Sequence, residues 1–198
     1  MKMIRYGAWA LVVLVFAALG YVWLSQHYGK PLGELAGAGI GGPFTLVSNE
    51  GVTVTEKDLL GKPHAVFFGF THCPEVCPTT LYEARGWMEK LGEKADNFAV
   101  YFITVDPERD DQHAIAEYMS LFDDRITGLT GSREEIDRAT KAYKVYSKKV
   151  PLGDGDYTMD HTATVYLMDA QGNFSGTISW GEDPDSALAK VRKLAANG

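Results

Sequence analysis

The sequence predicts an α/β domain in which helices flank a central sheet, and three features of the chain predict it. Two unbroken apolar runs, residues 64–70 and 98–105, are typical of strands that are covered on both faces. A segment with apolar residues at helical spacing follows each run. Two further strand-like segments, residues 161–168 and 174–179, then precede a last helical segment. This order of elements favours a helix-flanked sheet.

The first part of the chain is predicted to be a membrane anchor, residues 1–24. Residues 6–24 contain no charged side chain, and a helix of that length spans about 28 Å, close to the thickness of a bilayer. Lys2 and Arg5 keep the N-terminal end in the cytoplasm under the positive-inside rule. A signal peptide cleaved near Ala18 is the alternative. Either interpretation places the remainder outside the cytoplasm, and we expect a single-pass protein of the inner membrane whose domain lies in the periplasm.

A linker and a folded domain are predicted to follow. Residues 25–43 are Gly-rich and lack apolar periodicity, which is typical of a linker. The domain, residues 44–198, is expected to begin with a hairpin that joins 44–47 to 52–55.

The helices of the domain carry local start signals. Pro78 opens the first helix, and Asp185 is expected to cap the last one. Ser132 and Glu135 form a capping box. The expected elements after the hairpin are, in order, a strand at 64–70, a helix at 78–92, a strand at 98–105, helices at 110–122 and 132–143, strands at 161–168 and 174–179 with a turn at 169–173, and a helix from 185.

The composition narrows the classes of protein to which the chain can belong. Of its 198 residues, 45% are hydrophobic and 12% aromatic, which excludes a wholly disordered chain. A formal net charge of −7 argues against nucleic-acid binding, because nucleic-acid-binding proteins usually carry a basic face. Two cysteines are too few for a disulfide scaffold, but they are enough for a single site.

The two cysteines lie between a predicted strand and a predicted helix. Cys77 comes directly before the helix that Pro78 opens, where the helix dipole and unpaired N–H groups favour a thiolate. The spacing of Cys73 and Cys77 places both sulfurs on one side of a helical turn, near enough to share a metal ion or to bond to each other. A structural disulfide in an exported protein is the alternative that this spacing leaves open.

Several segments resemble the Sco (SenC/PrrC) family of cytochrome oxidase copper-assembly proteins in order and spacing. They are FFGFTHCPEVCPTTL, TVDPERD, YTMDHTATVYLMD and GTISWGE. The resemblance runs from about Phe44 to the C-terminus and implies a thioredoxin-like fold. It also implies a copper site formed by Cys73, Cys77 and His161. The implied task is to supply or mature the CuA centre of cytochrome c oxidase subunit II, with copper taken from an upstream donor.

The donor chemistry agrees with that implication. Two thiolates and one imidazole suit Cu(I) and tolerate Cu(II), and three protein ligands leave the ion open to exchange. Zinc also accepts this donor set, but no well-placed carboxylate base is evident beside it. Thioredoxin-like reductases resemble one another in using C-x2-C and a cis-proline, whereas this chain has C-x3-C and, at the later position, Asp160 and His161.

Two other functions remain open at this stage. The first is a thiol–disulfide reductase that keeps the cysteine ligands of a partner's copper site reduced through a redox-active Cys73–Cys77 pair. The second is a sensor in which the same pair reports the redox state. Oxidation to a disulfide removes both sulfur ligands, so one dithiol can serve metal binding and redox chemistry in turn.

Other polar residues near these segments receive simpler interpretations. Without the cysteines and the resemblance, His161 would be read as a hydrogen-bonded residue at a strand start, and His72 is expected to point away from Cys73. Asp160 is expected to cap an element or to face solvent, and the alternative is that it orients His161 by accepting a hydrogen bond. Residues 148–159 are predicted to be a loop able to move His161. The acids of the TVDPERD segment and after it are expected to lie at a strand end and a helix start; they are Asp106, Glu108, Asp110 and Asp111.

Overall fold

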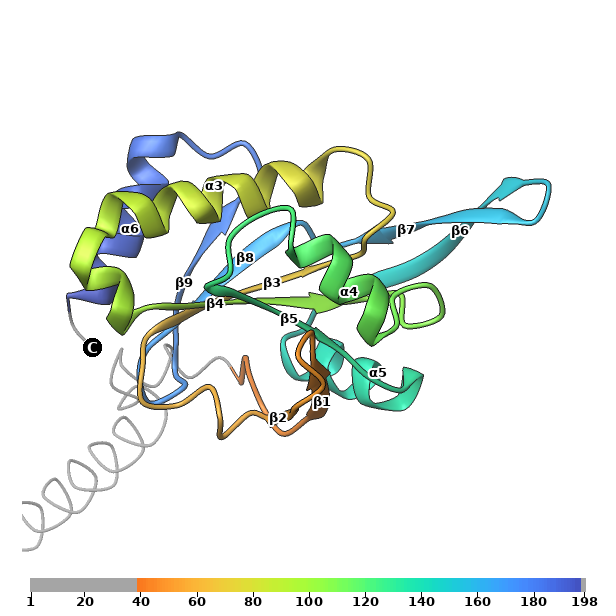
Figure 1. The fold of residues 1–198 in the computed structure, drawn as a ribbon, viewed down its shortest axis with the longest axis horizontal. Helices are drawn as coiled ribbons and strands as arrows, with labels where there is room; N and C mark the ends of the chain where they lie inside the picture. Colours follow the sequence, from red (N-terminus) through yellow and green to blue (C-terminus); the bar gives the residue numbers. More distant parts are fainter. Residues whose placement is uncertain (1–38, 197–198) are drawn as a thin grey trace, which may run out of the picture. The chain divides into compact units, whose positions relative to one another are not determined.

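A seven-stranded mixed sheet forms the centre of the computed structural model, which describes residues 39–196 (Figure 1). The strand order is β2-β1-β5-β4-β3-β8-β9, and β3, β4 and β5 run parallel to one another. The remaining pairings are antiparallel. The strands are β1 (Thr45–Ser48), β2 (Thr53–Thr55), β3 (His64–Gly69), β4 (Ala99–Thr104), β5 (Ile126–Thr130), β8 (Thr164–Met168) and β9 (Phe174–Ser179).

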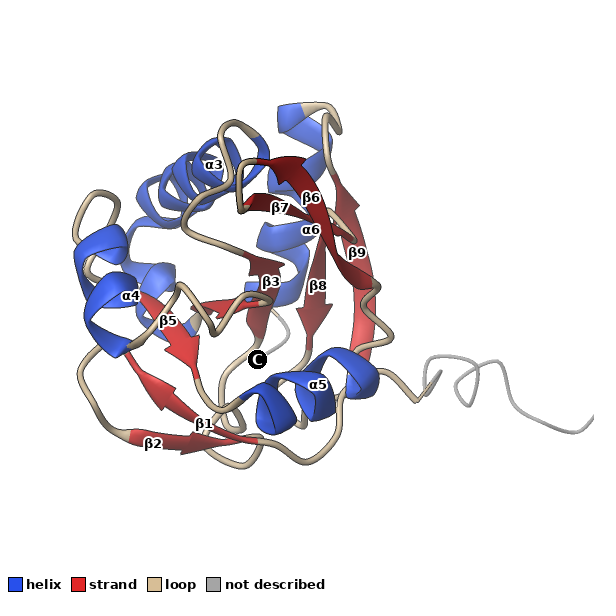
Figure 2. Cartoon of the chain, turned by 90° about the vertical axis from the view of Figure 1, so that its right-hand side faces the viewer, coloured by secondary structure: helices blue, strands red, loops and turns tan. Residues whose placement is uncertain are grey.

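Helices cover both faces of this sheet, so the predicted α/β class is confirmed. In Figure 1, α3 and α6 lie above the sheet and α5 lies below it, and Figure 2 shows the same arrangement from the side. The helical elements are α3 (Val76–Leu91), the 3-10 helix η1 (Gly92–Asn97), α4 (Gln112–Met119), α5 (Arg133–Ala142) and α6 (Pro184–Ala195).

The central strand β3 carries the core because every one of its residues is buried. On one face, the Phe67 ring lies 6.0 Å from the ring of Phe102 in β4. On the other face, Phe68 packs against Tyr143 and Tyr166 at centroid distances of 5.3 and 6.2 Å. Strands buried on both faces read as continuous apolar runs, which is why the sequence could predict this strand.

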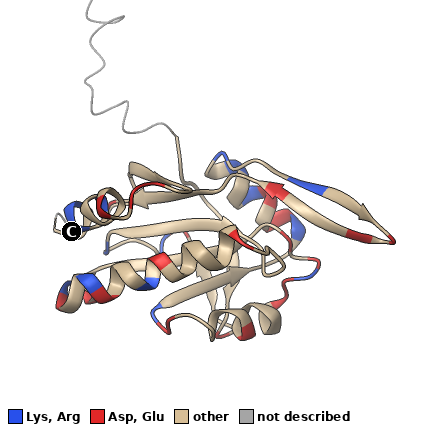
Figure 3. Cartoon of the chain, turned by 90° about the horizontal axis from the view of Figure 1, so that it is seen from above, with Lys and Arg blue, Asp and Glu red and all other residues tan. Residues whose placement is uncertain are grey.

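A projecting hairpin corrects the loop predicted at residues 148–159. Strands β6 (Ser147–Gly153) and β7 (Asp156–His161) pair with each other in a separate two-stranded sheet that extends from the body of the domain (Figures 1 and 3). Most of their residues are exposed or half-buried, so no apolar alternation marks them. The Gly- and Asp-rich stretch that indicated a loop forms the turn, where Gly153, Asp154 and Gly155 all have positive φ.

Other element boundaries also differ from the prediction. Helix α3 begins at Val76, so Cys77 lies inside its first turn. Pro78 is tolerated there because a residue in the first turn has no helical partner for its N–H, and the N–H that proline lacks is therefore not needed. Helix α6 is capped by Asp183, whose carboxylate accepts from the Ser186 N–H at 2.9 Å, and Asp185 lies in the first turn. The strand predicted at 161–168 is divided between β7 and β8.

The start of the described region contacts the folded domain. The Gly41 N–H donates to the Ala142 carbonyl at 3.0 Å, and Ile40 packs against the core. The predicted anchor, residues 1–24, and the predicted linker as far as residue 38 lie outside the described residues. Within residues 39–196, no helix is both long enough and apolar enough to cross a membrane.

Candidate metal centre

Three side chains from separate parts of the chain converge beyond the end of β3. Cys73 lies in the loop after β3, Cys77 in the first turn of α3, and His161 at the end of β7. One donor atom from each, two Sγ atoms and an imidazole nitrogen, lies within 4.8 Å of the other two. The Cys77 Sγ is 3.9 Å from His161 Nε2. The structure therefore brings together the three residues that the sequence predicted as ligands.

A tight turn after β3 places the two sulfurs. The Cys73 N–H donates to the Phe70 carbonyl at 3.2 Å, and Cys73 Sγ accepts the N–H of Cys77 at 3.3 Å. Gly69 makes room for this arrangement, because a Cβ at that position would lie 2.7 Å from Cys77 Sγ and 2.6 Å from the Phe102 ring. Only a glycine lets the Cys77 sulfur pack against the end of the strand.

His161 is oriented by the backbone. Its Nδ1 lies 3.1 Å from the Thr162 carbonyl, and an N–H donated there leaves Nε2 with a free electron pair on the side of Cys77. The imidazole also meets the Phe70 ring edge-on, with centroids 5.7 Å apart. Asp160 is exposed, as its simpler interpretation expects, because neighbouring side chains on a strand point to opposite faces. The alternative, in which Asp160 orients His161, does not hold, since the partner of His161 Nδ1 is the Thr162 carbonyl.

The two thiols have opposite electrostatic environments. A hydrogen bond from the Cys77 thiol is the largest effect that lowers the pKa of Cys73, and the neighbouring His161 side chain and backbone N–H groups lower it further, so that it reaches about 4 against the opposing effect of burial. The pKa of Cys77 is raised by its hydrogen bond to Cys73, by burial and by the negative charge of Cys73. The sequence predicted the thiolate at Cys77. The structure instead directs the N–H of the first helical turn at Cys73 Sγ, so the stabilised thiolate is Cys73.

Two buried carboxylates support the loops that carry the centre. Asp110 is fully buried and accepts hydrogen bonds from the Thr71 N–H at 3.0 Å, from the Thr71 hydroxyl at 2.5 Å and from the Thr104 hydroxyl at 2.6 Å. Asp106 is also fully buried. These acids lie where the sequence predicted, since Asp106 follows β4 and Asp111 caps α4, but the burial of Asp106 and Asp110 was not predicted.

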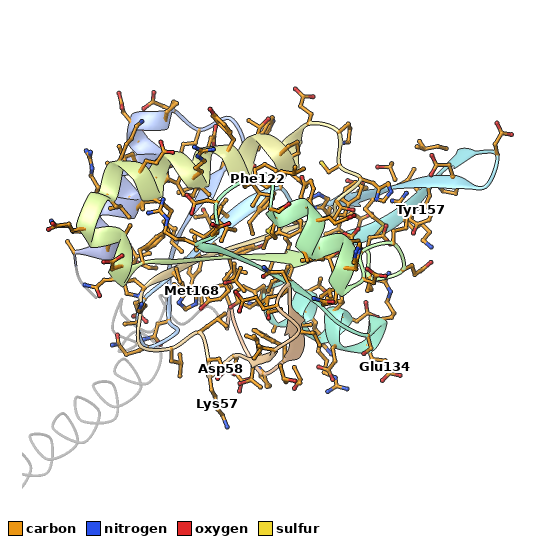
Figure 4. The ribbon with its side chains drawn as sticks, in the orientation of Figure 1. Lys57, Asp58, Phe122, Glu134, Tyr157 and Met168 are labelled. Atoms are coloured by element: carbon orange, nitrogen blue, oxygen red, sulfur yellow. The ribbon has the colours of Figure 1, made fainter. Side chains whose placement is uncertain are left out.

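Arg109 joins the second of these carboxylates to Tyr157 of β7, which pairs with Pro151 in the half of the hairpin nearer its turn. Its Nε donates to Asp106 at 2.6 Å and its Nη1 to the Tyr157 carbonyl at 2.9 Å. The guanidinium lies 3.8 Å from the centre of the Tyr157 ring, whose hydroxyl donates to Asp106 at 2.9 Å. Tyr157 is labelled on the hairpin in Figure 4. Sequence reasoning missed Arg109 and Tyr157; the only signal was that each belongs to a recognised segment, TVDPERD or YTMDHTATVYLMD.

The remaining histidines of the described region lie outside the three-donor cluster. His72 is exposed, with Nδ1 3.0 Å from the Thr71 hydroxyl. His64 is buried at the opposite end of β3, where burial lowers its pKa. His113 is exposed on α4, 3.8 Å from Glu117.

The donor set fits a soft, low-coordinate metal ion. Both cysteines are free thiols. A trigonal ion with metal–sulfur and metal–nitrogen bonds of about 2.3 and 2.05 Å spaces these donors by about 3.8 Å, and the Cys77 Sγ and His161 Nε2 are 3.9 Å apart. Two sulfurs and one imidazole nitrogen are the ligands that Cu(I) prefers, and within the described residues no carboxylate belongs to the cluster.

Comparison with protein families gives one match that covers most of the chain. Residues 33–196 match the model of the family described as SCO1/SenC. The mitochondrial SCO1 homolog 1 of Arabidopsis thaliana is 43% identical over 157 residues, which are 79% of this chain and 47% of the relative. The mitochondrial SCO1 homolog of Homo sapiens is 41% identical over 152 residues, 75% of this chain and 48% of the relative. The chain thus spans about half the length of these relatives.

Solved structures show the same likeness. Copper-bound ScoI of Bradyrhizobium japonicum is 47% identical, with a TM-score of 0.73 over 78% of this chain and 99% of that one. Copper-bound ScoI of Arabidopsis thaliana is 40% identical, with a TM-score of 0.72 and the same coverage of both chains. BsSco, described by its disulfide switch and as a member of the Sco family of cytochrome c oxidase assembly proteins, is 25% identical, with a TM-score of 0.63 over 79% of this chain and 94% of that one.

Proposed function

The chain belongs to the SCO1/SenC family, and from this premise we propose that it is a copper chaperone for cytochrome c oxidase. It binds one copper ion through Cys73, Cys77 and His161 and transfers it to the oxidase. The observation that carries this proposal is the approach of three soft donors to within 4.8 Å of one another from three separate elements.

Copper is the cargo that the centre suits best. Two ScoI relatives of at least 40% identity carry copper. The Cys73 thiolate and the free Nε2 of His161 can bind Cu(I) without losing a proton, whereas the buried Cys77 thiol gives up its proton as the ion binds. Three protein donors leave Cu(I) open to attack by a fourth ligand, and this allows transfer by ligand exchange.

The acceptor is proposed to be the CuA centre of oxidase subunit II, with copper reaching this protein from an upstream donor. BsSco belongs to a family of cytochrome c oxidase assembly proteins, which supports an oxidase as the partner. We further propose that residues 1–24 anchor the chain in the inner membrane and that a linker lets the domain reach its partner on the periplasmic side. Ile40 and Gly41 contact the domain, so the proposed linker is limited to the part of residues 25–43 that precedes residue 39.

A thiol–disulfide reductase is the second candidate, because the two thiols differ so strongly in acidity. The half-buried Cys73 thiolate is the attacking sulfur, and the buried Cys77 thiol is placed to resolve a mixed disulfide. A disulfide between them removes both sulfur ligands. The chain would then hold either copper or a disulfide at one time, and the disulfide switch of BsSco favours such an alternation.

Copper titration of the reduced full-length chain tests the proposal. We expect one copper per chain, with an intense sulfur-to-metal charge-transfer band in the Cu(II) form that disappears in Cys73→Ser and Cys77→Ser. His161→Ala separates the two functions, because copper transfer should collapse while dithiol exchange survives. His113→Ala is the matched control, since it removes an exposed histidine outside the cluster. Normal copper transfer by His161→Ala would remove the third ligand from the proposal.

A further inference from the structure

His72 is a second imidazole beside the centre that the three-donor cluster does not use. It directly precedes Cys73 in the turn closed by the hydrogen bond from the Cys73 N–H to the Phe70 carbonyl. Its side chain is 57% exposed, whereas Cys73 is half-buried and Cys77 fully buried. His72 is therefore more accessible to an ion in solvent than either sulfur is.

A chain of hydrogen bonds determines which nitrogen of His72 carries the proton. The Thr71 Oγ1 lies 2.5 Å from Asp110 Oδ1 and 3.0 Å from His72 Nδ1. A carboxylate only accepts and a hydroxyl has one proton to give. The Thr71 proton therefore goes to Asp110, and the Thr71 oxygen accepts the N–H of His72 Nδ1. This tautomer leaves Nε2 with a free electron pair.

This arrangement is typical of an imidazole that binds a metal ion. Metal-binding histidines commonly donate their second ring N–H to a carboxylate, a backbone carbonyl or water. His161 does this through the Thr162 carbonyl, and His72 does it through the Thr71 hydroxyl, which Asp110 holds in turn. Asp110 is fully buried and also accepts the Thr71 N–H at 3.0 Å, so it holds the backbone of the residue before His72 in place.

We propose that His72 Nε2 is an exchange ligand, the first protein donor that the copper ion meets on loading and the last that it leaves on release. The inference rests on the proposed function, in which copper is the cargo. Because His72 is outside the three-donor cluster, its bond to the ion exists only during transfer.

The exchange balances without a redox step. On loading, the bond between Cu(I) and a donor of its carrier breaks as the bond to His72 Nε2 forms. Cys73 Sγ then displaces His72, and Cys77 and His161 complete the centre. The Cys77 proton passes to water, and copper remains Cu(I) throughout.

A ligand that binds copper only during transfer lowers the same energy barrier for loading and for release. Its loss should therefore slow both rates and leave their ratio, and so the copper affinity, unchanged. Loading of the reduced full-length chain is followed by stopped flow from the Cu(I) complex of bicinchoninate, and release is followed into excess bathocuproine disulfonate. We expect His72→Ala to slow both rates by about tenfold, as loss of a residue that supports a metal site commonly does. The control His113→Ala should exchange copper at the wild-type rates.

Two variants of Thr71 test the hydrogen-bond chain. Thr71→Val removes the acceptor for His72 Nδ1 and should slow exchange, whereas Thr71→Ser keeps the hydroxyl and should restore it. Nitrogen-15 NMR of the metal-free chain gives a readout that does not depend on copper. It should show His72 protonated at Nδ1 in the wild type and in Thr71→Ser, and a mixture of tautomers in Thr71→Val.

Three results would overturn the inference, and they are distinguishable from a failure of the proposed function. If the wild type binds one copper but His72→Ala exchanges it at the same rates, His72 has no part in transfer. If His72→Ala speeds release without slowing loading, His72 is a permanent ligand. A wild-type His72 protonated at Nε2 removes the structural basis. If the wild type takes up no copper at all, the proposed function fails and this inference fails with it.

Discussion

Replacement of Gly69 by alanine tests whether the Cys77 sulfur is packed against the end of β3. The new Cβ would lie 2.6 Å from Phe102 Cε2 and 2.7 Å from Cys77 Sγ, and both side chains are fully buried. These distances are about 1 Å shorter than a favourable contact. Overpacking of this kind costs about 1–3 kcal/mol in the free energy of unfolding. A loss of about 2 kcal/mol lowers the Tm of a domain of this size by about 4–8 °C.

The same change should weaken the metal centre, because relief of the clash moves Cys77 Sγ or the backbone that carries it. We expect copper affinity to fall by about tenfold, the lower end of what changes beside a metal ligand cause. Urea denaturation of the metal-free chain measures the free energy of unfolding, and competition with a Cu(I) chelator measures the affinity.

Gly86→Ala is a matched control of opposite sign. Gly86 lies inside α3, and a Cβ there meets no atom within 4 Å. Alanine is favoured over glycine in a helix by about 1 kcal/mol, so this variant should be slightly more stable than the wild type and should bind copper equally well. If Gly69→Ala matches the wild type in both stability and affinity, the close packing inferred at Cys77 is wrong.

Three further predictions concern the surroundings of the centre. Arg109→Ala leaves the buried Asp106 without its cation and should lower the free energy of unfolding by about 3 kcal/mol in urea denaturation. A loss below about 1 kcal/mol would show that the Arg109–Asp106 ion pair does not stabilise the fold. Because its lowered pKa makes Cys73 a thiolate at neutral pH, iodoacetamide should alkylate Cys73 at a nearly constant rate between pH 6 and 8 and spare Cys77, as read by mass spectrometry. A tenfold rise per pH unit would show an ordinary thiol. Asp183→Ala should cost about 1 kcal/mol of stability as the loss of a helix cap, and Asp185→Ala should cost less.

The elements that sequence reasoning identified are those with local signals. The predicted Ser132 cap of α5 is confirmed, since the Ser132 hydroxyl accepts the Glu135 N–H at 3.3 Å, whereas the Glu135 carboxylate accepts the Thr45 N–H at 3.1 Å. Strands β3 and β4 were predicted because a strand that is buried on both faces consists of a continuous run of apolar residues. Such signals depend on residues a few positions apart, so no knowledge of the remaining fold is needed to read them.

The elements that were missed owe their form to distant residues. Strand β5 contains Gly128, and glycine weakens a strand signal. The tertiary structure requires this glycine, because α4 crosses β5 so closely that a Cβ at Gly128 would lie 2.4 Å from Ile115 Cγ2. The β6–β7 hairpin has few buried residues of its own, and Arg109, distant in the sequence, contacts β7 through the Tyr157 carbonyl.

The order of residues was enough to predict the three donors, because the spacing of Cys73 and Cys77 marks a thiol pair and the resemblance of the segment around His161 implies the third ligand. Only the tertiary structure decided how those donors differ. It assigned the thiolate to Cys73, since the first-turn N–H of α3 points at that sulfur. The hydrogen bond to Cys73 and then burial raise the pKa of Cys77, which stays protonated. Hydrogen-bond direction and burial arise from contacts between distant segments, and residue order alone does not specify them.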